Sequence, residues 1–400
     1  MKTGWKEEPL ANLCEFERGL TYAKGDEVEV SNNVVLRATN INLETNLLDF
    51  SELRYINDSV IVQKNKKVKK GSLIICTASG SKNHLGKVAF IDNDYNYAFG
   101  GFMGMITPKT TIVPKYLFYI MTSDAYKDFI GTLSDGVNIN NLTFEKLKRL
   151  PISYPDYFEQ ERIVRILDEA FERIVKAKVN TEKNLRNARA LFESYLEGVF
   201  SQRGEGWVVK TVGEVVQKTE TVNPLHSPED EFDYIDVSSI SNKTFQIEET
   251  QRLKGKDAPS RARKLVKTDD VLLATVRPTL RRIAIVPISL NDQVCSTGYF
   301  VLRPKPELDH RWVFYFLISK DFMRQMEILQ KGASYPAVTD GEVKLQKIPI
   351  PPLQEQFDIV YKFDALRIKT QQLEVIYQQK LAALEELKKS LLEKAFSGEL

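Results

Sequence analysis

Two long stretches of the chain carry apolar residues at the three- and four-residue spacing of an α-helix. Residues 158–200 and 353–396 contain no proline and almost no glycine, and they are rich in Glu, Lys, Arg, Leu and Ala. This composition and periodicity predict one long helix in each stretch. Prolines stand in front of both, at Pro155 and at Pro351 and Pro352, where a missing backbone N–H costs little.

The apolar positions of the two predicted helices correspond. In the second helix they are Ile359, Phe363, Leu366, Leu373, Tyr377, Leu384, Leu387 and Leu391. In the first helix the matching positions are Ile163, Leu167, Ala170, Ala177, Thr181, Ala188, Leu191 and Tyr195. This heptad-like spacing is typical of helices that pack along each other, so we expect a paired coiled coil. The alternative is that each helix packs on the globular part of its own repeat.

Outside these helices the pattern changes to short apolar runs separated by turn residues. We expect strands at four of these runs, residues 72–79, 87–92, 271–276 and 282–287. A helix-like stretch follows in each half, around 114–130 and around 309–330. Each half of the chain therefore reads as a mixed α and β domain followed by one long helix.

The second half of the chain repeats the first. A shift of 196 residues places residues 116–123 on 312–319 and Gly136 on Gly332. Before both long helices the sequence runs from Pro-Ile through a second proline to a Glu-Gln pair. A period of about 200 residues is too long for a solenoid unit and indicates a duplicated domain. The predicted boundaries are 1–150 and 207–348 for the two domains, and 151–206 and 349–400 for the helices with their linker.

Composition narrows the class of protein. The 42% hydrophobic and 28% charged content of the 400 residues is ordinary for a globular protein. We see no signal peptide, and no apolar run approaches the roughly 18 residues of a membrane span. Cys14, Cys76 and Cys295 are odd in number and far apart, which favours a reducing, cytoplasmic setting. Three histidines and no Cys-x-x-Cys pair argue against a zinc site, and we expect no bound metal.

Basic residues gather in the same part of each repeat, although the net charge is only +2. Residues 61–87 hold seven lysines and no acid, and residues 252–282 hold ten Lys or Arg against three Asp. A single lysine run is usually a solvated face. Two runs at equivalent positions of a duplicated domain favour one duplicated anionic ligand, and duplex DNA with paired sites fits that description.

Motifs that resemble catalytic sites do not hold on inspection. GSKNHLGKV at 80–88 has five residues between its glycines and a valine after its lysine, so it departs from the phosphate-binding loop. Asp340 lies too close to the Glu342-Val-Lys344 triplet for a nuclease motif. We therefore predict no catalytic residue in this chain.

The doubled pattern resembles the DNA-specificity subunit of type I restriction–modification enzymes. The family's motif runs from Gly through Leu/Val-Thr to Pro-Ile-Pro-Pro-Leu-x-Glu-Gln and then enters a long helix. The second repeat shows it from Gly332 to Gln356, and the first shows it more loosely from Gly136 to Gln160. The first copy has Tyr154 in place of a proline and an apparent two-residue insertion before its Glu-Gln pair. The resemblance covers essentially the whole chain.

The resemblance implies an α+β fold of two target-recognition domains. Each has a twisted sheet with flanking helices, and two long antiparallel helices separate them. It implies that each domain reads one half of a split DNA sequence, and that the helices set the spacing. It also implies partners: two methyltransferase subunits that use S-adenosylmethionine, and ATP-dependent restriction subunits that use ATP and magnesium. This chain would bind none of these cofactors and no membrane.

Base edges are read by polar and basic side chains on elements that enter a groove. The candidates are Thr39, Asn40, Ser81, Lys82, Asn83, His84, Asn138, Asn140, Arg277, Thr279, Arg281, Arg282, Ser334 and Tyr335. We expect Arg277 to read a base, because Pro278 stiffens its loop. Arg281 and Arg282 face opposite ways if the strand is extended, and we expect both mainly to contact phosphates.

Two alternatives stay open at this point. The chain could be a self-sufficient methyltransferase or nuclease, although the expected catalytic motifs are missing. It could also be a DNA-binding scaffold without methyltransferase partners.

Overall fold

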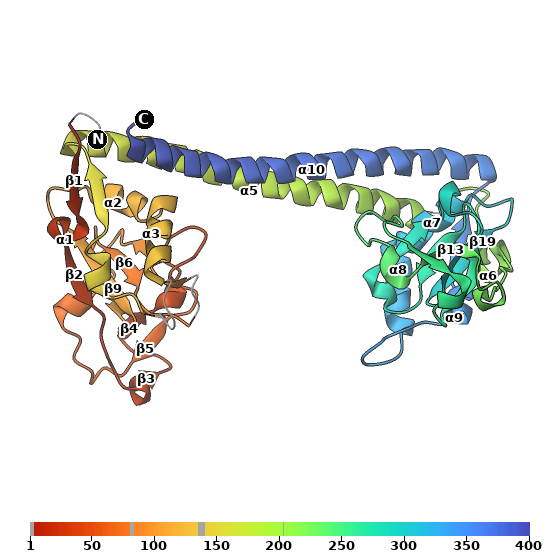
Figure 1. The fold of residues 1–400 in the computed structure, drawn as a ribbon, viewed down its shortest axis with the longest axis horizontal. Coiled ribbons are helices and arrows are strands. Elements are labelled where there is room, and N and C mark those ends of the chain that lie inside the picture. The colour runs from red at the N-terminus through yellow and green to blue at the C-terminus, as the bar shows by residue number, and fades with distance from the viewer. Residues whose placement is uncertain (1–3, 81–83, 135–140, 203) are drawn as a thin grey trace. The chain divides into compact units, whose positions relative to one another are not determined.

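The computed structural model describes residues 4–80, 84–134, 141–202 and 204–400 (Figure 1). The chain divides into two compact units. Unit 1 comprises Met1–Thr181 and Gln379–Leu400, and unit 2 comprises Glu182–Gln378. The boundaries between these units fall within the two long helices, whereas the sequence placed the domain boundaries at 150, 206 and 348. The units describe compactness, so the domain boundaries stay a prediction about function.

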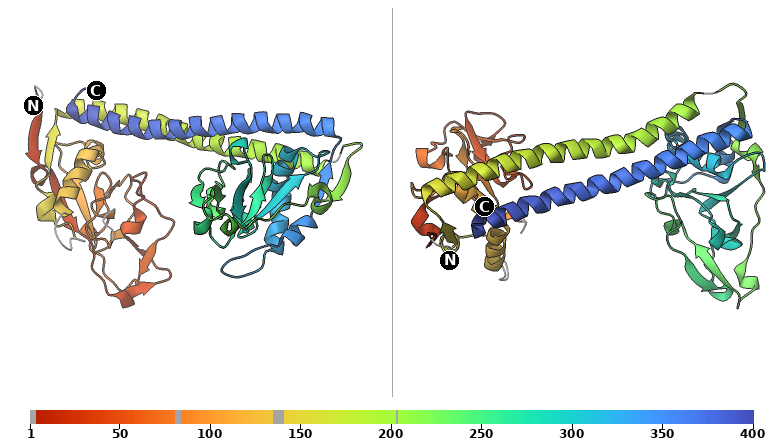
Figure 2. Two further views of the ribbon diagram at one scale, coloured as in Figure 1. Left: turned by 45° about the vertical axis from the view of Figure 1, so that its right-hand side comes forward. Right: turned by 90° about the horizontal axis from the view of Figure 1, so that it is seen from above.

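Both long helices form where the sequence predicts them. They are α5 (Tyr157–Ser201) and α10 (Leu353–Ser397). Within each unit they lie side by side (Figure 2). In unit 1, Arg162 donates to the carbonyl of Leu400, and Lys178 pairs with Glu385 at 2.9 Å. Residue numbers rise along α5 where they fall along α10, so the two helices are antiparallel.

The predicted seam is buried at some positions and exposed at others, and the buried ones include Thr181 and Ala188 in the middle of α5. Ile163, Leu167 and Phe363 are buried, but Leu191 and Leu387 are 53% and 47% exposed. Both interpretations of the helices are therefore partly right. The helices pair, and their ends also join the globular cores. Those ends carry Leu392 and Ala395 in unit 1, and Leu196 in unit 2.

Each unit contains two four-stranded sheets and one two-stranded sheet within the described residues. In unit 1 the sheets are β2 (Cys14–Arg18), β9 (Met103–Pro108), β6 (Leu73–Cys76) and β7 (Val88–Phe90); β3 (Glu27–Val28), β5 (Arg54–Ile56), β4 (Asn33–Leu36) and β8 (Ala98–Phe99); and β1 (Lys6–Pro9) with β10 (Pro151–Tyr154). In unit 2 they are β12 (Val216–Gln217), β19 (Tyr299–Pro304), β16 (Val271–Ala274) and β17 (Ile283–Ile285); β14 (Gln251–Lys254), β13 (Glu231–Ile235), β18 (Gln293–Ser296) and β15 (Ala262–Val266); and β11 (Val208–Thr211) with β20 (Lys347–Ile350). The four predicted strands correspond to β6, β7, β16 and β17.

The helix-like stretch after the strands consists of two helices in each unit. They are α2 (Pro114–Ile120) and α3 (Asp124–Ser134) in unit 1, and α7 (His310–Ile318) and α8 (Lys320–Leu329) in unit 2. The remaining short helices are α1 (Leu10–Leu13), α4 (Phe144–Leu147), α6 (Val212–Val215) and α9 (Asp340–Lys344). A serine causes the break in unit 2: Ser319 Oγ accepts from the N–H of Phe322 and so caps the start of α8. Ser123 Oγ accepts from Tyr126 N–H at the equivalent place.

The repeated Glu-Gln motif has a packing explanation. Gln160 is fully buried, its Oε1 accepts from Val113 N–H at 2.8 Å, and its Nε2 donates to the carbonyl of the proline five residues earlier at 3.0 Å. Gln356 makes the same contacts with Asp309 N–H at 2.9 Å and with its own proline at 2.9 Å. Each glutamine satisfies backbone groups that would otherwise be buried without partners. It thereby ties the start of a long helix to the loop before α2 or α7.

These contacts also correct the alignment of the two motifs. Because both glutamines bind the proline five residues before them, Pro155 corresponds to Pro351. The strand registers agree, since Lys6 pairs with Tyr154 in β1–β10 and Val208 pairs with Ile350 in β11–β20. The two-residue insertion expected from the sequence is therefore wrong, and the two copies have equal length here.

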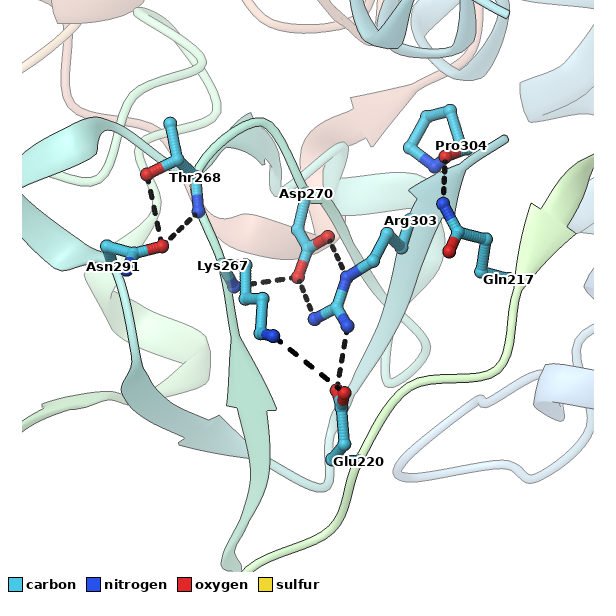
Figure 3. A network of polar contacts seen from close by, with 8 residues as sticks. All are labelled: Gln217, Glu220, Lys267, Thr268, Asp270, Asn291, Arg303 and Pro304. Carbon is cyan, nitrogen blue, oxygen red and sulfur yellow. Dashed lines mark hydrogen bonds and ion pairs between the residues drawn. The ribbon is translucent and has the colours of Figure 1, made fainter. Parts of the chain in front are cut away.

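The two repeats differ at one pair of neighbouring positions, of which one lies just before β6 or β16 and the other lies in β9 or β19. In unit 1 the hydroxyls of Ser72 and Thr107 hydrogen-bond at 2.9 Å. In unit 2 the equivalent residues are Asp270 and Arg303, which form two parallel contacts at 2.8 and 2.9 Å (Figure 3). Arg303 also donates to Glu220 at 2.7 Å. The Asp270 side chain is only 1% exposed, so the pairing with Arg303 is what stabilises its negative charge in the interior.

Among the described residues, no helix is long and apolar enough to cross a membrane. The three cysteines carry free thiols and are buried. Burial raises the pKa of Cys14 and of Cys295 to about 12, so neither is a reactive thiolate.

Candidate nucleic-acid interface

Two loops that are far apart in sequence lie together at one sheet edge of unit 2. The first follows β16 and contains a 3₁₀ turn, Pro278–Leu280. The second precedes α9. Arg277 N–H donates to the carbonyl of Pro336 at 2.6 Å, and Val338 N–H donates to that of Thr275 at 2.9 Å. The backbone thus joins the two segments in which sequence analysis placed Arg277, Ser334 and Tyr335.

Arg277 is exposed and held in place by the second loop. Its Nη2 donates to the carbonyl of Ser334 at 3.1 Å, and its guanidinium carbon lies 4.9 Å from the centre of the Tyr335 ring. The Tyr335 side chain is 72% exposed. The backbone of Arg277 has a φ of 49°, an uncommon left-handed conformation for a non-glycine residue.

Arg277 does not pair with either aspartate that precedes its strand, Asp269 or Asp270. Asp270 binds Arg303, and Asp269 lies 3.5 Å from His310. Among the described residues no carboxylate lies within ion-pair distance of Arg277. Its side chain is exposed, and its other N–H donors have no acceptor among the described residues, which suits recognition of an acceptor on a ligand.

Arg281 and Arg282 turn inward instead. Arg281 donates to the carbonyl of Ile318 at 2.7 Å, and its guanidinium lies 5.6 Å from the ring of Phe245. Arg282 donates to three carbonyls of the turn at Val237–Ser239 and the residue after it, at 2.9–3.1 Å. The strand expected here is wrong at Arg281, whose φ is 56°. Both side chains hold this loop against the rest of unit 2. Their contact with phosphates stays a prediction. Thr279, which lies between Arg277 and Arg281 in the sequence, is exposed.

Part of the corresponding site in unit 1 can be described. Ser81, Lys82, Asn83, Asn138 and Asn140 lie outside the described residues.

His84 lies at the end of the unit 1 loop, where its Nδ1 is 3.2 Å from Lys87 Nζ. Lys87 is buried and donates to the carbonyl of Ile41 at 2.9 Å. Burial, and then the charge of Lys87, lower the pKa of His84. Lys87 precedes β7 as Arg282 precedes β17, and both bind the carbonyl after the equivalent turn (Ile41 or Ile240). A structural cation is therefore duplicated along with the fold.

Of the two weaker candidates, Thr39 is exposed and Asn40 is buried. Asn40 Oδ1 accepts from Arg37 N–H at 2.8 Å, and its Nδ2 donates to the carbonyls of Asp49 and Glu52 at 2.8 and 2.9 Å. All of these contacts are internal, so Asn40 shapes the turn. Arg37, which sequence analysis did not select, precedes the same turn.

Ion pairs among the described residues neutralise much of the basic run in unit 2, but only one lysine of the run in unit 1. Of the ten basic residues at 252–282, six form ion pairs: Arg252, Lys254, Lys256, Lys264, Lys267 and Arg281. In the run of unit 1, Lys66 pairs with Glu17 at 2.7 Å, and Lys87 is buried. The charge count in the sequence therefore overstates the positive charge that a ligand could meet.

The part of the chain that the structure describes contains no group of three or more His, Cys, Asp or Glu that could hold a metal ion. The acidic residues of the nuclease-like motif have contacts within the fold. Asp340 binds Lys264 at 2.8 Å. Glu342 caps α9 by accepting from Thr339 N–H at 2.8 Å, and this hydrogen bond is the largest cause of its pKa falling to about 2.

We expect Arg277→Ala to lower affinity for the proper DNA site by about 1–3 kcal/mol and to change affinity for a scrambled duplex much less. The reason is that an exposed arginine fork reads an acceptor pair on one base. Binding to both duplexes at several salt concentrations measures this. Leu280→Ala, which removes a partly exposed apolar side chain from the same loop, is the matched control and should leave both affinities unchanged. Equal weakening on both duplexes would assign Arg277 to the phosphates instead.

Comparisons with known proteins agree with this arrangement. Residues 2–183 and 204–386 each match the model of the type I restriction modification DNA specificity domain. The chain is 23% identical over 418 residues to the type I restriction enzyme EcoKI specificity subunit of Escherichia coli K12, covering 99% of this chain and 89% of that protein. It is also 23% identical over 421 residues to the StySPI specificity subunit of Salmonella potsdam, with the same coverage.

Solved structures show the same fold. A chain from a study of complex assembly and conformational transition of the type I R-M system has a TM-score of 0.78 at 19% identity, covering 100% of this chain and 99% of that one. The HsdS subunit from Thermoanaerobacter tengcongensis has a TM-score of 0.65 at 18% identity, covering 99% and 97%. With two matched domains that span most of its length, this chain belongs to the type I restriction modification DNA specificity family.

Proposed function

We propose that this chain is the DNA-specificity subunit of a type I restriction–modification complex. Each of its two domains reads one half of a bipartite duplex target, and the chain itself performs no chemistry. The observation that carries this proposal is the pair of family matches, at residues 2–183 and 204–386. Two domains of one kind in one chain provide two readers for one split target.

The long helices offer surfaces for partner subunits. In unit 1, Val175 and Val179 on α5 are 59% and 56% exposed. In unit 2, α10 exposes Tyr361, Ile368 and Val375 at 74%, 55% and 52%. These three residues are seven apart, so they share one face of the helix. Apolar side chains exposed on one face suit a protein interface, and we propose that methyltransferase subunits dock there.

The remaining partners follow from the same proposal. The methyltransferase subunits bind S-adenosylmethionine and methylate adenine. ATP-dependent restriction subunits, which use ATP and magnesium, join the complex to translocate and cut DNA. The complex works in the cytoplasm, and this chain determines which DNA sequence the complex recognises.

The test is methyl transfer with and without the partners. We expect the purified chain to transfer no label from S-adenosylmethionine to DNA, because it lacks the catalytic motifs. Adding the modification subunits encoded in the same host should produce adenine methylation at a split target. A chain that methylates DNA alone would be a self-sufficient enzyme. A chain that binds DNA but recovers no methyltransferase on co-purification would be a scaffold.

A further inference from the structure

An open cavity of about 570 Å³ lies in unit 1 beside the start of the candidate reading loop. Its lining includes Ala78 and Ser79 from that loop, Arg37 and Thr39 from the turn after β4, and Phe102 from the turn before β9. These segments are far apart in sequence, and they converge in unit 1 at the sheet edge equivalent to the one where the two loops meet in unit 2. In unit 2 the residues equivalent to Ala78 and Ser79 are Val276 and Arg277.

Arg37 brings an uncompensated cation into this cavity. Its Nε is shielded from solvent and has no hydrogen-bond partner. No carboxylate lies within ion-pair distance of it among the described residues. The nearby Glu27 is already engaged, since it accepts from Tyr22 at 3.3 Å and lies 3.8 Å from Arg54. A partly buried guanidinium without an acceptor is costly in a fold and indicates a site that an external acceptor completes.

Phe102 adds an exposed aromatic side chain to the same cavity. It is 74% exposed, so the core does not explain it. Its backbone is fixed, because its carbonyl accepts from the N–H and the hydroxyl of Thr77, each at 2.9 Å. The side chain is therefore presented by a preformed turn.

We infer that this cavity is a base-reading subsite of the first recognition domain. Arg37 donates its fork to O6 and N7 of a guanine in the major groove, and Phe102 contacts the methyl group of a neighbouring thymine. The inference rests on the proposed function and names residues for it. In unit 2 the position of Arg37 is occupied by Asp236, whose carboxylate accepts from Tyr234 and Ser238. The opposite charge means that the two domains read different bases.

The experiment uses the assembled complex and duplexes that carry its own bipartite target. Replacing the guanine with 7-deazaguanine removes N7, and replacing the thymine with deoxyuridine removes its methyl group. We expect 7-deazaguanine at one position of one half-site to weaken binding of the unchanged complex, and to have no further effect on Arg37→Ala. Arg37→Ala itself should reduce discrimination at that position by about 10- to 100-fold. Deoxyuridine should weaken the unchanged complex about fourfold, the value of one buried methyl group, and leave Phe102→Ala unaffected.

Matched variants separate reading from folding. Arg54→Ala removes an exposed arginine next to the same Glu27, and Ile61→Ala removes an apolar side chain that is 87% exposed in the same unit. Both should keep full discrimination. Arg37→Lys keeps the charge and loses the planar fork, so it should fold and bind, with less discrimination than the unchanged complex and more than Arg37→Ala.

Two negative outcomes have different meanings. An unchanged complex with no sequence preference would overturn the proposed function. A complex with a split target that Arg37→Ala and Arg37→Lys leave unaltered would overturn only the subsite. Loss of discrimination in both half-sites at once would also overturn it, because the cavity belongs to one domain.

Discussion

Arg303→Ala is expected to destabilise unit 2 by about 3–5 kcal/mol, the cost of leaving one partner of a buried ion pair unpaired. Asp270 is 1% exposed, and Arg303 contacts both of its carboxylate oxygens (Figure 3). Without the guanidinium, the carboxylate must either stay charged in the interior or take up a proton. Urea unfolding followed by tryptophan fluorescence measures the effect, since Trp207 and Trp312 both lie in unit 2.

The first repeat supplies the rescue for this variant. Ser72 and Thr107 fill the same two positions with a neutral hydrogen bond of 2.9 Å. The double variant Asp270→Ser/Arg303→Thr should therefore recover most of the lost stability. Arg252→Ala removes an exposed pair with Glu231, and its cost should stay within about 0–1 kcal/mol. If the double variant is as unstable as Arg303→Ala, the charge of Asp270 is not the cause.

Acid should weaken the same network in the unchanged protein. The hydrogen bond from Arg303 is the largest cause that lowers the pKa of Glu220. A carboxylate with a lowered pKa stabilises the fold above its unfolded pKa, and this contribution disappears as the pH falls through its folded pKa. The neutral double variant lacks this contact, so it should lose less stability on acidification.

Exchange of one recognition domain is expected to replace one half-site and leave the other unchanged. Each mismatched base pair costs about 1–3 kcal/mol, roughly additively, so a half-site of several bases should switch completely. The structure gives the junctions. Leu10 N–H donates to the carbonyl of Leu150 at 2.8 Å, and Val212 N–H donates to that of Gln346 at 2.8 Å. Grafting residues 10–150 from a relative keeps β1, β10 and the buried Gln160 of this chain.

The measurement is methylome sequencing of a host that carries the chimera and its modification subunits. The reciprocal graft of residues 212–346 is the matched control and should alter the other half-site. A single continuous target, or a change in both halves after one exchange, would mean that the two domains do not read independently.

The elements were predictable where local pattern decides them. The long helices follow from periodicity and from the absence of proline, and the central strands follow from short apolar runs between turns. The break between α7 and α8 was missed because a single serine makes it. Ser319 caps α8 within an otherwise apolar stretch, so the periodicity hides the end of one helix and the start of the next.

The candidate site was harder to predict because tertiary contacts decide which arginines face outward. Arg277 and Arg282 are five residues apart in one basic run. Arg277 lies against Tyr335, while Arg282 donates to carbonyls more than forty residues earlier in the chain. The proline after Arg277 suggests a stiff loop, but no local feature shows which arginine the fold uses for its own contacts. Arg37 shows the converse, since a single arginine between apolar residues gives no charge signal, and only the fold places it in a cavity.

The division of the chain has a consequence for how the protein is made. Unit 2 is one continuous segment, whereas unit 1 needs its last part, Gln379–Leu400, to complete its core with Leu392 and Ala395. During synthesis from the N-terminus, the domain that is translated first is therefore finished last. We expect unit 2 to close before unit 1, with the apolar surface of unit 1 exposed in the meantime. A nascent chain at that stage is a natural client for a chaperone.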